Sequence, residues 1–304
     1  MKLEYHTEHF DSVEGFIERL SPLNKIITNR RSNFIYRGQA DSEWSLVPSL
    51  LRDGENNPLR RIAVNEDGKF NRGFQILYEI LFIKNFVDAC DEIGLVIPGD
   101  SYEFRNIIEC KFNYKDNYEM GRLIWPDDKL FKIMALVQNQ GIPTRLLDWT
   151  RNPYVSVYFA ASSAIDIFIK KNDFDIYNKN IAIWALDTEL KNLYKDSLEI
   201  INVPGATSVN LAAQKGCFTC MLSKEEKEGG DDFDIGIDGI EGHHINSLWK
   251  FTISASKSIR LLKFCEDIGI MASTLFPGFD GVARYWHNKI NMSDRRFRDR
   301  IFIL

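Results

Sequence analysis

The chain has 304 residues, of which 44% are hydrophobic and 12% aromatic, so it can build a sizeable core, and wholesale disorder is excluded. Its net charge of −5 argues against broad electrostatic capture of nucleic acid or of an anionic membrane. The N-terminus lacks the apolar stretch of a secretory signal, and no window is apolar over the length of a membrane span. Together with an odd number of cysteines, these features predict a cytoplasmic protein with reduced thiols and no membrane partner.

The first predicted elements are helical and then extended. Residues 1–31 are expected to form a helical N-terminal region, because residues 11–20 begin with capping side chains and continue as an amphipathic pattern. Residues 32–39, SNFIYRGQ, predict a strand that stops at Gly38. Alternation along this strand places Arg37 and Gln39 on one face and Tyr36 on the other.

Three helices are expected in the middle of the chain. Residues 72–90 are apolar on most sides, which predicts a buried helix. Residues 127–140 predict a second helix, ended by Gly141 and Pro143. The third begins at Asn152-Pro153, where asparagine caps and proline occupies the first helical position.

The last third of the chain predicts strands around an acidic segment. Residues 181–186, 216–222 and 248–254 are apolar runs typical of buried strands. The cysteines of the C-x-x-C in the second run have no second ligand pair, so buried thiols are favoured over a metal site. Residues 224–244 are rich in glycine and acid without the spacing of a calcium loop, so an exposed or mobile insertion without metal is expected. Residues 255–266 and the sequence after Pro277-Gly278 predict two further helices.

Two stretches are polar where packing would favour apolar residues: 36–39, YRGQ, and 144–150, TRLLDWT. An arginine within an apolar strand is costly unless it is paired or binds an anion, and the glycine after it lets a ligand or another backbone come close. Asp148 is placed to accept either Arg37 or Arg145. These residues therefore form either a binding cleft or a buried ion-pair network that joins a strand to a helix.

Both stretches also resemble a known family. YRGQADSEWSLVPSLLR and QGIPTRLLDWTRNPYVSVYFA, together with Gln214, Gly216 and Phe218, are similar to the FRG domain, a bacterial and phage-associated domain. The resemblance runs from about residue 32 to 281 and implies a single FRG-type domain over residues 1–304, with the acidic loop as an insertion. Asn139 stands where the family usually has a histidine, so a proton transfer through that imidazole is not expected here.

The order of the motifs is also similar to that of ADP-ribosyltransferases. This implies an α+β fold in which a mixed or antiparallel split sheet surrounds a cleft and helices lie outside it. The resemblance places catalytic roles at Arg37, Asp148 and Gln214. The residues that it implies for binding NAD are Tyr36, Gly38, Gln39, Thr144 and Arg145. Gln214 lacks the charge that stabilises an oxocarbenium-like transition state, so Asp148 or another acid supplies it, or the chemistry differs, or the domain only binds.

Two functions follow from this resemblance. The first is a toxin or anti-phage effector that uses NAD to modify a protein or nucleic acid. The second is a non-catalytic sensor that recognises a nucleotide, a nucleic acid or a phage protein. Possible partners are an antitoxin or a phage trigger protein, and no metal is expected. Under either function, Arg37, Thr144, Arg145 and Asp148 are expected to converge on one cleft.

Overall fold

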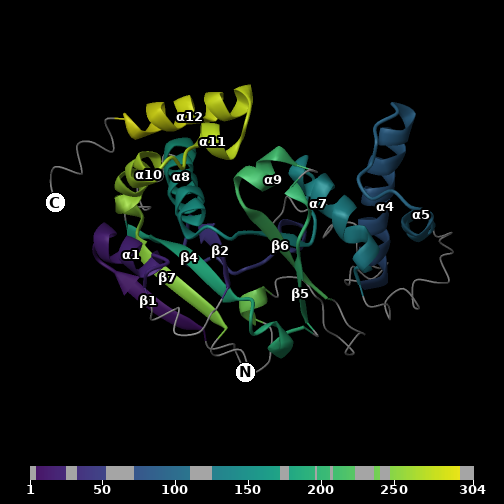
Figure 1. The fold of residues 1–304 in the computed structure, drawn as a ribbon, viewed down its shortest axis with the longest axis horizontal. Coiled ribbons are helices and arrows are strands. Elements are labelled where there is room, and N and C mark those ends of the chain that lie inside the picture. The colour runs from purple at the N-terminus through teal and green to yellow at the C-terminus, as the bar shows by residue number, and fades with distance from the viewer. Residues whose placement is uncertain are drawn as a thin grey trace.

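The computed structural model describes residues 5–24, 33–52, 72–109, 125–171, 178–195, 197–205, 208–222, 236–239 and 247–294. Its centre is one seven-stranded sheet with the strand order β1-β7-β4-β2-β3-β6-β5 (Figure 1). The strands are β1 (His6–Phe10), β2 (Phe34–Gln39), β3 (Leu146–Thr150), β4 (Asn180–Asp187), β5 (Leu198–Ile201), β6 (Gly216–Met221) and β7 (Leu248–Ser254). Only the β1–β7 pair is parallel. The predicted α+β class with a mixed sheet is confirmed.

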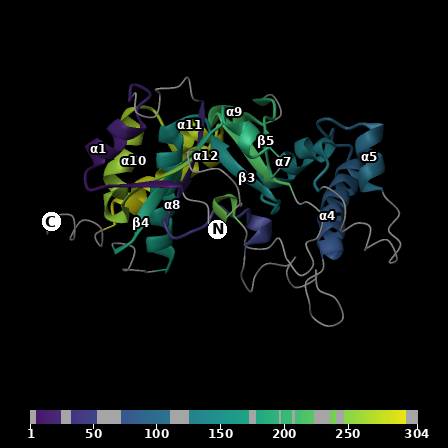
Figure 2. The same cartoon turned by 90° about the horizontal axis from the view of Figure 1, so that it is seen from below.

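Helices pack against this sheet and extend beyond one end of it. They are α1 (Val13–Leu20), α4 (Arg72–Glu92), α5 (Tyr102–Ile108), α7 (Phe131–Asn139), α8 (Pro153–Lys171), α9 (Val209–Ala213), α10 (Ser258–Asp267), α11 (Ala272–Leu275) and α12 (Phe279–Met292). Figures 1 and 2 both place α4 and α5 at the opposite end of the molecule from α1 and α10. None of the helices in the described ranges is both long and apolar enough to cross a membrane.

The sheet divides between β2 and β3. These two strands share a single residue pair, Tyr36 with Thr150, whereas β2 pairs with β4 over six residues. The sheet therefore consists of two parts, β1-β7-β4-β2 and β3-β6-β5, that are joined at one point. Beyond that point β2 and β3 have no ladder, so the backbone near Arg37 and Asp148 is free for other contacts. This division agrees with the expected split sheet.

The two faces of β2 follow the predicted alternation. Phe34 and Tyr36 pack against the core formed with α8, whereas Ile35 joins a second core around Trp184 of β4. A third core lies among α4, α5, α7, β3 and β6. Arg37, on the same side as Ile35, is consequently kept away from α8.

Gly38 lets α8 approach β2 closely. A methyl group at this position would lie 2.0 Å from the carbonyl oxygen of Ser156 and 2.9 Å from the backbone nitrogen of Ala160. The sequence predicted that a ligand or another backbone comes close to Gly38, and the structure shows that this is the backbone of α8.

We expect Gly38→Ala to destabilise the fold by about 3 kcal/mol or more, because neither backbone can move without separating α8 from the sheet. Gly94→Ala is the matched control: Gly94 has a φ of 70° but no atom within 4 Å of the added methyl group, so only about 1 kcal/mol of backbone strain is expected. Urea denaturation of both variants checks the difference. Equal losses of unfolding free energy would contradict the packing role of Gly38.

Two expectations need correction. The N-terminal region is not wholly helical: α1 is present, but β1 precedes it and pairs with β7, because the apolar positions of His6–Phe10 are too few for a helix yet fit a sheet edge. The acidic insertion at 224–244 is not wholly exposed, because Ile237 is buried in the core around Trp184. Within that insertion the structure describes residues 236–239, and the prediction for its other residues lies outside the described ranges.

Candidate functional site

A pocket of about 570 Å³ opens where β2 leaves β3. Its floor is formed by β2 from Arg37 to Gln39, and its wall by the loop that follows, from Ala40 to Val47. Arg52, the exposed indole of Trp44 and Ser163 of α8 complete the lining. The two guanidinium groups and the aromatic ring suit an anionic ligand that carries a flat ring, and Glu43 adds one carboxylate to the pocket.

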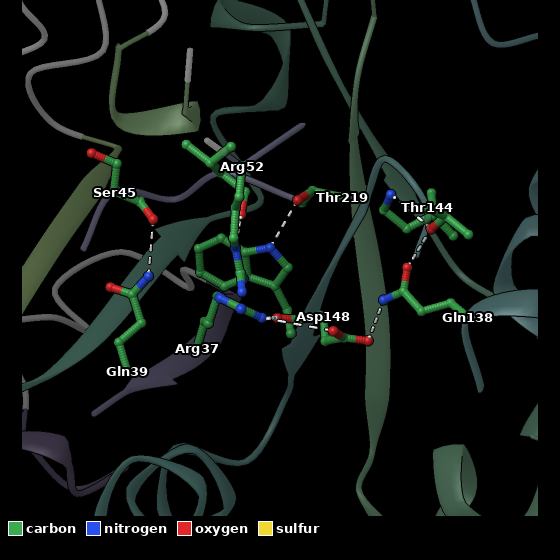
Figure 3. Close-up of polar contacts among 11 residues, drawn as sticks. Arg37, Gln39, Ser45, Arg52, Gln138, Thr144, Asp148 and Thr219 are labelled. Carbon is green, nitrogen blue, oxygen red and sulfur yellow. Dashed lines mark hydrogen bonds and ion pairs between the residues drawn. The ribbon is translucent and has the colours of Figure 1, made fainter. Parts of the chain in front are cut away.

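Arg37 reaches across the gap between the two parts of the sheet (Figure 3). Its Nη1 donates to the backbone carbonyl of Asp148 at 2.8 Å and lies 3.8 Å from the carboxylate oxygen Oδ2 of the same residue. The Arg37 side chain is only 15% exposed, while that of Asp148 is 63% exposed. Burial lowers the pKa of Arg37 to about 10, Asp148 opposes that shift and Arg52 adds to it.

The guanidinium groups of Arg37 and Arg52 line the same pocket, and Asp148 raises the pKa of both against the larger effect of burial. Arg52 Nε donates to the carbonyl of Val47 at 2.9 Å, and burial also lowers its pKa. The Nε of Arg37 is buried and has no hydrogen-bond partner among the described residues. Because unsatisfied buried donors are rare, this nitrogen marks a place where a ligand or water accepts a hydrogen bond.

A chain of side-chain contacts holds the carboxylate of Asp148 from the other side. Gln138 at the end of α7 donates from Nε2 to Asp148 Oδ1 at 2.7 Å and accepts a hydrogen bond from the hydroxyl of Thr144. Thr144 Oγ1 also accepts from the backbone nitrogen of Leu146 at 3.1 Å. Figure 3 shows Thr144, Gln138 and Asp148 in this order, leading toward Arg37. Gln138 is therefore a site residue that the sequence analysis did not select, while its neighbour Asn139 is exposed.

The loop that forms the wall of the pocket is held at two consecutive residues, Ser45 and Leu46. Gln39 donates from Nε2 to the carbonyl of Ser45 at 3.1 Å and accepts from Trp184 Nε1 at 2.6 Å. The backbone nitrogen of Leu46 donates to Asp238 Oδ1 at 2.7 Å, and its carbonyl accepts from the backbone nitrogen of Ile237 at 3.2 Å. The described part of the acidic insertion thus holds the pocket loop in place through its hydrogen bonds to Leu46.

We expect Asp238→Ala to speed amide hydrogen exchange at Leu46 by about tenfold, because the buried amide loses its only side-chain acceptor in the described structure. Asp238→Asn keeps an oxygen acceptor at the same place and is expected to retain the protection. Exchange followed by mass spectrometry on peptides that cover residues 43–50 measures both. If the asparagine variant also loses protection, the negative charge of Asp238 holds the loop, and the hydrogen bond from Leu46 alone does not.

Arg145 does not belong to this pocket, contrary to the expected convergence. Its guanidinium forms a two-point contact with Glu79 of α4, at 2.7 Å from Nε to Oε2 and 2.5 Å from Nη2 to Oε1. The two side chains are 1% and 2% exposed. Neighbouring residues of an extended segment point to opposite faces, so Thr144 joins the Gln138 contacts while Arg145 turns into the core beside α4.

Two other expected site residues lie away from Arg37. Tyr36 packs on the α8 side of the sheet, where burial first and the nearby Tyr154 second raise its pKa to about 12. Gln214 donates from Nε2 to the carbonyl of Leu275 at 3.1 Å, and its own carbonyl accepts from Thr150 Oγ1 at 2.7 Å. Neither side chain lines the pocket. Of the eight expected residues, Arg37, Gly38, Gln39, Thr144 and Asp148 form the site or its supports.

A second hollow of about 590 Å³ lies at the other end of β2, beside β5. Its lysines and Arg151 are exposed and are mixed with Glu189 and Glu199. We favour the Arg37 pocket as the functional site, because its central charged group is buried and held in one orientation. Among the described residues, no three His, Cys, Asp or Glu side chains gather where they could hold a metal ion.

Comparison with known proteins finds one family match. The FRG domain model matches residues 101–166, a stretch that runs from the start of α5 into α8 and contains Gln138, Thr144 and Asp148. No curated protein matches the chain, and no solved structure does so either. Arg37 and the pocket loop lie outside the matched stretch, although they contact it through Asp148. Residues 101–166 of the chain therefore match the FRG domain, and this stretch contains Asp148, whose backbone carbonyl accepts from Arg37.

Proposed function

We propose that this chain is an FRG-domain effector that binds NAD in the pocket beside Arg37 and transfers ADP-ribose to a protein or nucleic acid. The observation that carries the proposal is the Nε of Arg37, a buried donor without a hydrogen-bond partner in the described structure, at the place where the sheet divides. A planar guanidinium donates two parallel hydrogen bonds to a pyrophosphate or a ribose. The exposed ring of Trp44 offers a surface on which a base can stack.

The reaction needs a carboxylate as well as a cation. In the transfer, the bond between C1′ of the ribose and the nicotinamide nitrogen breaks, and nicotinamide leaves with the bonding electron pair. A nucleophile of the target forms the new bond at C1′ and loses its proton to a base. Positive charge grows on the ribose meanwhile, and a nearby carboxylate stabilises it. We assign this role to Asp148, whose carboxylate is held by Gln138, and Glu43 in the pocket wall is the second candidate.

A non-catalytic function is the second candidate. Gln214, to which the resemblance to ADP-ribosyltransferases gives a catalytic role, is neutral. Its side chain contacts Leu275 and does not line the pocket. A pocket that binds a nucleotide without cleaving it serves as a sensor, which would report the nucleotide to a trigger or antitoxin protein. The two functions share the same pocket and differ in whether a bond of the ligand is broken.

The test measures NAD binding by calorimetry and nicotinamide release by chromatography on the same protein, alone and with cell lysate as a source of the acceptor. Asp148→Asn keeps the oxygen that accepts from Gln138 but removes the charge, so we expect binding within a few-fold of wild type and at least about a 100-fold loss of nicotinamide release. Glu43→Gln tests the second candidate: it is expected to retain most of the release, and a 100-fold loss in this variant instead of in Asp148→Asn would assign the role to Glu43. Binding without release by the wild type supports the sensor, and the absence of both contradicts the proposed pocket.

A further inference from the structure

The inner face of α12 is firmly attached to the rest of the molecule. Tyr285 donates from its hydroxyl to Glu266 of α10 at 2.7 Å, and Asn288 donates from Nδ2 to the hydroxyl of Tyr158 of α8 at 2.7 Å. One turn later, Asn291 donates to Asp166 of α8 at 3.0 Å. These contacts determine which side of α12 faces outward, and Figure 1 shows the helix at the edge of the molecule beyond α10 and α8.

The outward side of α12 is apolar. Its large side chains are Phe279, Val282, Trp286 and Ile290, which are 96%, 46%, 61% and 63% exposed. Steps of three, four and four residues place them on one side of a helix, and we name these four residues the outer stripe. A surface helix normally turns its apolar residues toward the core, so a stripe that points away from the core indicates a surface buried in an assembly.

The charges of α12 argue for a protein surface rather than a lipid surface. Arg284 donates to Asp280 at 2.8 Å and stacks on the ring of Phe276 at 4.5 Å. Lys289 contacts Glu266 at 2.5 Å. A helix that lies on a membrane directs its lysines and arginines at the lipid headgroups, whereas here both cations are neutralised within the chain. The net charge of −5 further disfavours an anionic membrane.

The outer stripe is complementary to itself when two copies of α12 run antiparallel. Phe279 then meets Ile290 of the second copy, and Val282 meets Trp286. The midpoint of each pair along the helix falls beside residue 284. A single two-fold axis through this point therefore produces both pairs. Each pair joins an aromatic ring to an aliphatic side chain. The exposed, small Ala283 lies next to this centre and lets the helices come close.

The area agrees with a modest interface. With about 150–250 Å² for each large side chain, the exposed fractions of the outer stripe amount to roughly 500 Å² per copy. Two copies would bury about 1,000 Å², which is near the lower limit for a specific interface. We propose that the chain forms a two-fold dimer in which the outer stripe of α12 packs antiparallel against that of a second copy. This inference does not depend on the proposed reaction.

The experiment follows the mass of the purified chain by light scattering and sedimentation velocity over a range of concentrations. The wild type is expected to approach twice the monomer mass of 35.2 kDa as the concentration rises. Trp286→Glu and Val282→Arg are each expected to remain monomeric, because each places a charge against an apolar side chain at both contacts. Tyr102→Glu is the matched control, since Tyr102 is an exposed aromatic residue on α5 at the far end of the molecule, and it is expected to dimerise like the wild type.

An equal mixture of Trp286→Glu and Val282→Arg tests the antiparallel register. In a mixed dimer the introduced arginine and glutamate face each other at one contact, and the native pair is kept at the other, so dimer formation is expected to return. Circular dichroism checks that both variants melt within a few degrees of the wild type. The proposal is overturned by a wild type that stays monomeric, by dimers that both variants retain, or by a mixture that stays monomeric. Flotation of the wild type with anionic vesicles, lost in Trp286→Glu, would overturn it in favour of a lipid surface.

Discussion

Arg37→Ala is expected to lower the affinity of the pocket for NAD by about 100-fold while the melting temperature falls by only a few degrees. The guanidinium of Arg37 donates to the backbone carbonyl of Asp148 at 2.8 Å, and the carboxylate of Asp148 is 63% exposed. Removal of Arg37 leaves that carboxylate in water, so no buried charge loses its partner. The stability loss is then that of a single hydrogen bond to a charged donor, about 1–2 kcal/mol.

Arg37→Lys separates the charge of this residue from its shape. The ammonium keeps the positive charge but cannot donate two parallel hydrogen bonds, so we expect a loss of affinity close to that of the alanine variant. Arg105→Ala is the matched control, because Arg105 pairs with Asp91 and Asp100 on the distant α5 side and should leave NAD binding unchanged. Calorimetry and thermal melting on all four proteins give the answer. A folded Arg37→Ala variant with full affinity would remove Arg37 from the site.

The sequence predicted the β2 side of this site well, because short-range patterns determine it. Alternation along residues 34–39 placed Arg37 and Gln39 on one face, and the glycine between them indicated a close approach. Asp148 was expected to accept either Arg37 or Arg145, and the structure selects Arg37. The split of the sheet came from the resemblance to a family and not from a local pattern.

The partner of Arg145 could not be predicted in the same way. Glu79 lies 66 residues earlier in the chain, in a helix whose sequence is apolar on most sides, and no local pattern distinguishes it from a surface acid. The buried ion-pair network that was weighed against a binding cleft is therefore real, but it belongs to Arg145. Arg145 thus has the structural role, whereas the binding role is proposed for Arg37.

Long-range contacts also explain the remaining differences. β1 was missed because a short, parallel edge strand depends on β7, which lies more than 200 residues later. Ile237 was missed because a single apolar residue in an acidic segment carries no periodicity, although it packs beside Leu46. Gln138 was missed because its role depends on the contact between α7 and β3, through which it donates to Asp148.

Arg145→Ala is expected to cost about 3–5 kcal/mol of unfolding free energy, the largest effect among the charged residues discussed. Glu79 and Arg145 are almost completely buried and make two short hydrogen bonds to each other. Glu79 also accepts from Trp125 Nε1 at 2.8 Å and from Gln75 Nε2 at 2.8 Å, so it is held in place and cannot turn toward water. Among the described residues Arg145 is the cation that pairs with Glu79, so without it the buried carboxylate is left uncompensated, and unfolding would expose it to water.

The double variant Glu79→Leu with Arg145→Met distinguishes the ion pair from simple packing. It removes both charges and keeps most of the volume, so we expect it to recover about half or more of the stability lost in Arg145→Ala. Recovery stays incomplete because the donors of Trp125 and Gln75 then lack their acceptor. Urea denaturation at neutral pH measures the three proteins, and NAD binding of the folded fraction should be unchanged in each. A double variant as unstable as Arg145→Ala would show that the shape of the arginine, and not its charge, joins α4 to β3, whereas loss of NAD binding in a folded Arg145→Ala protein would return Arg145 to the site.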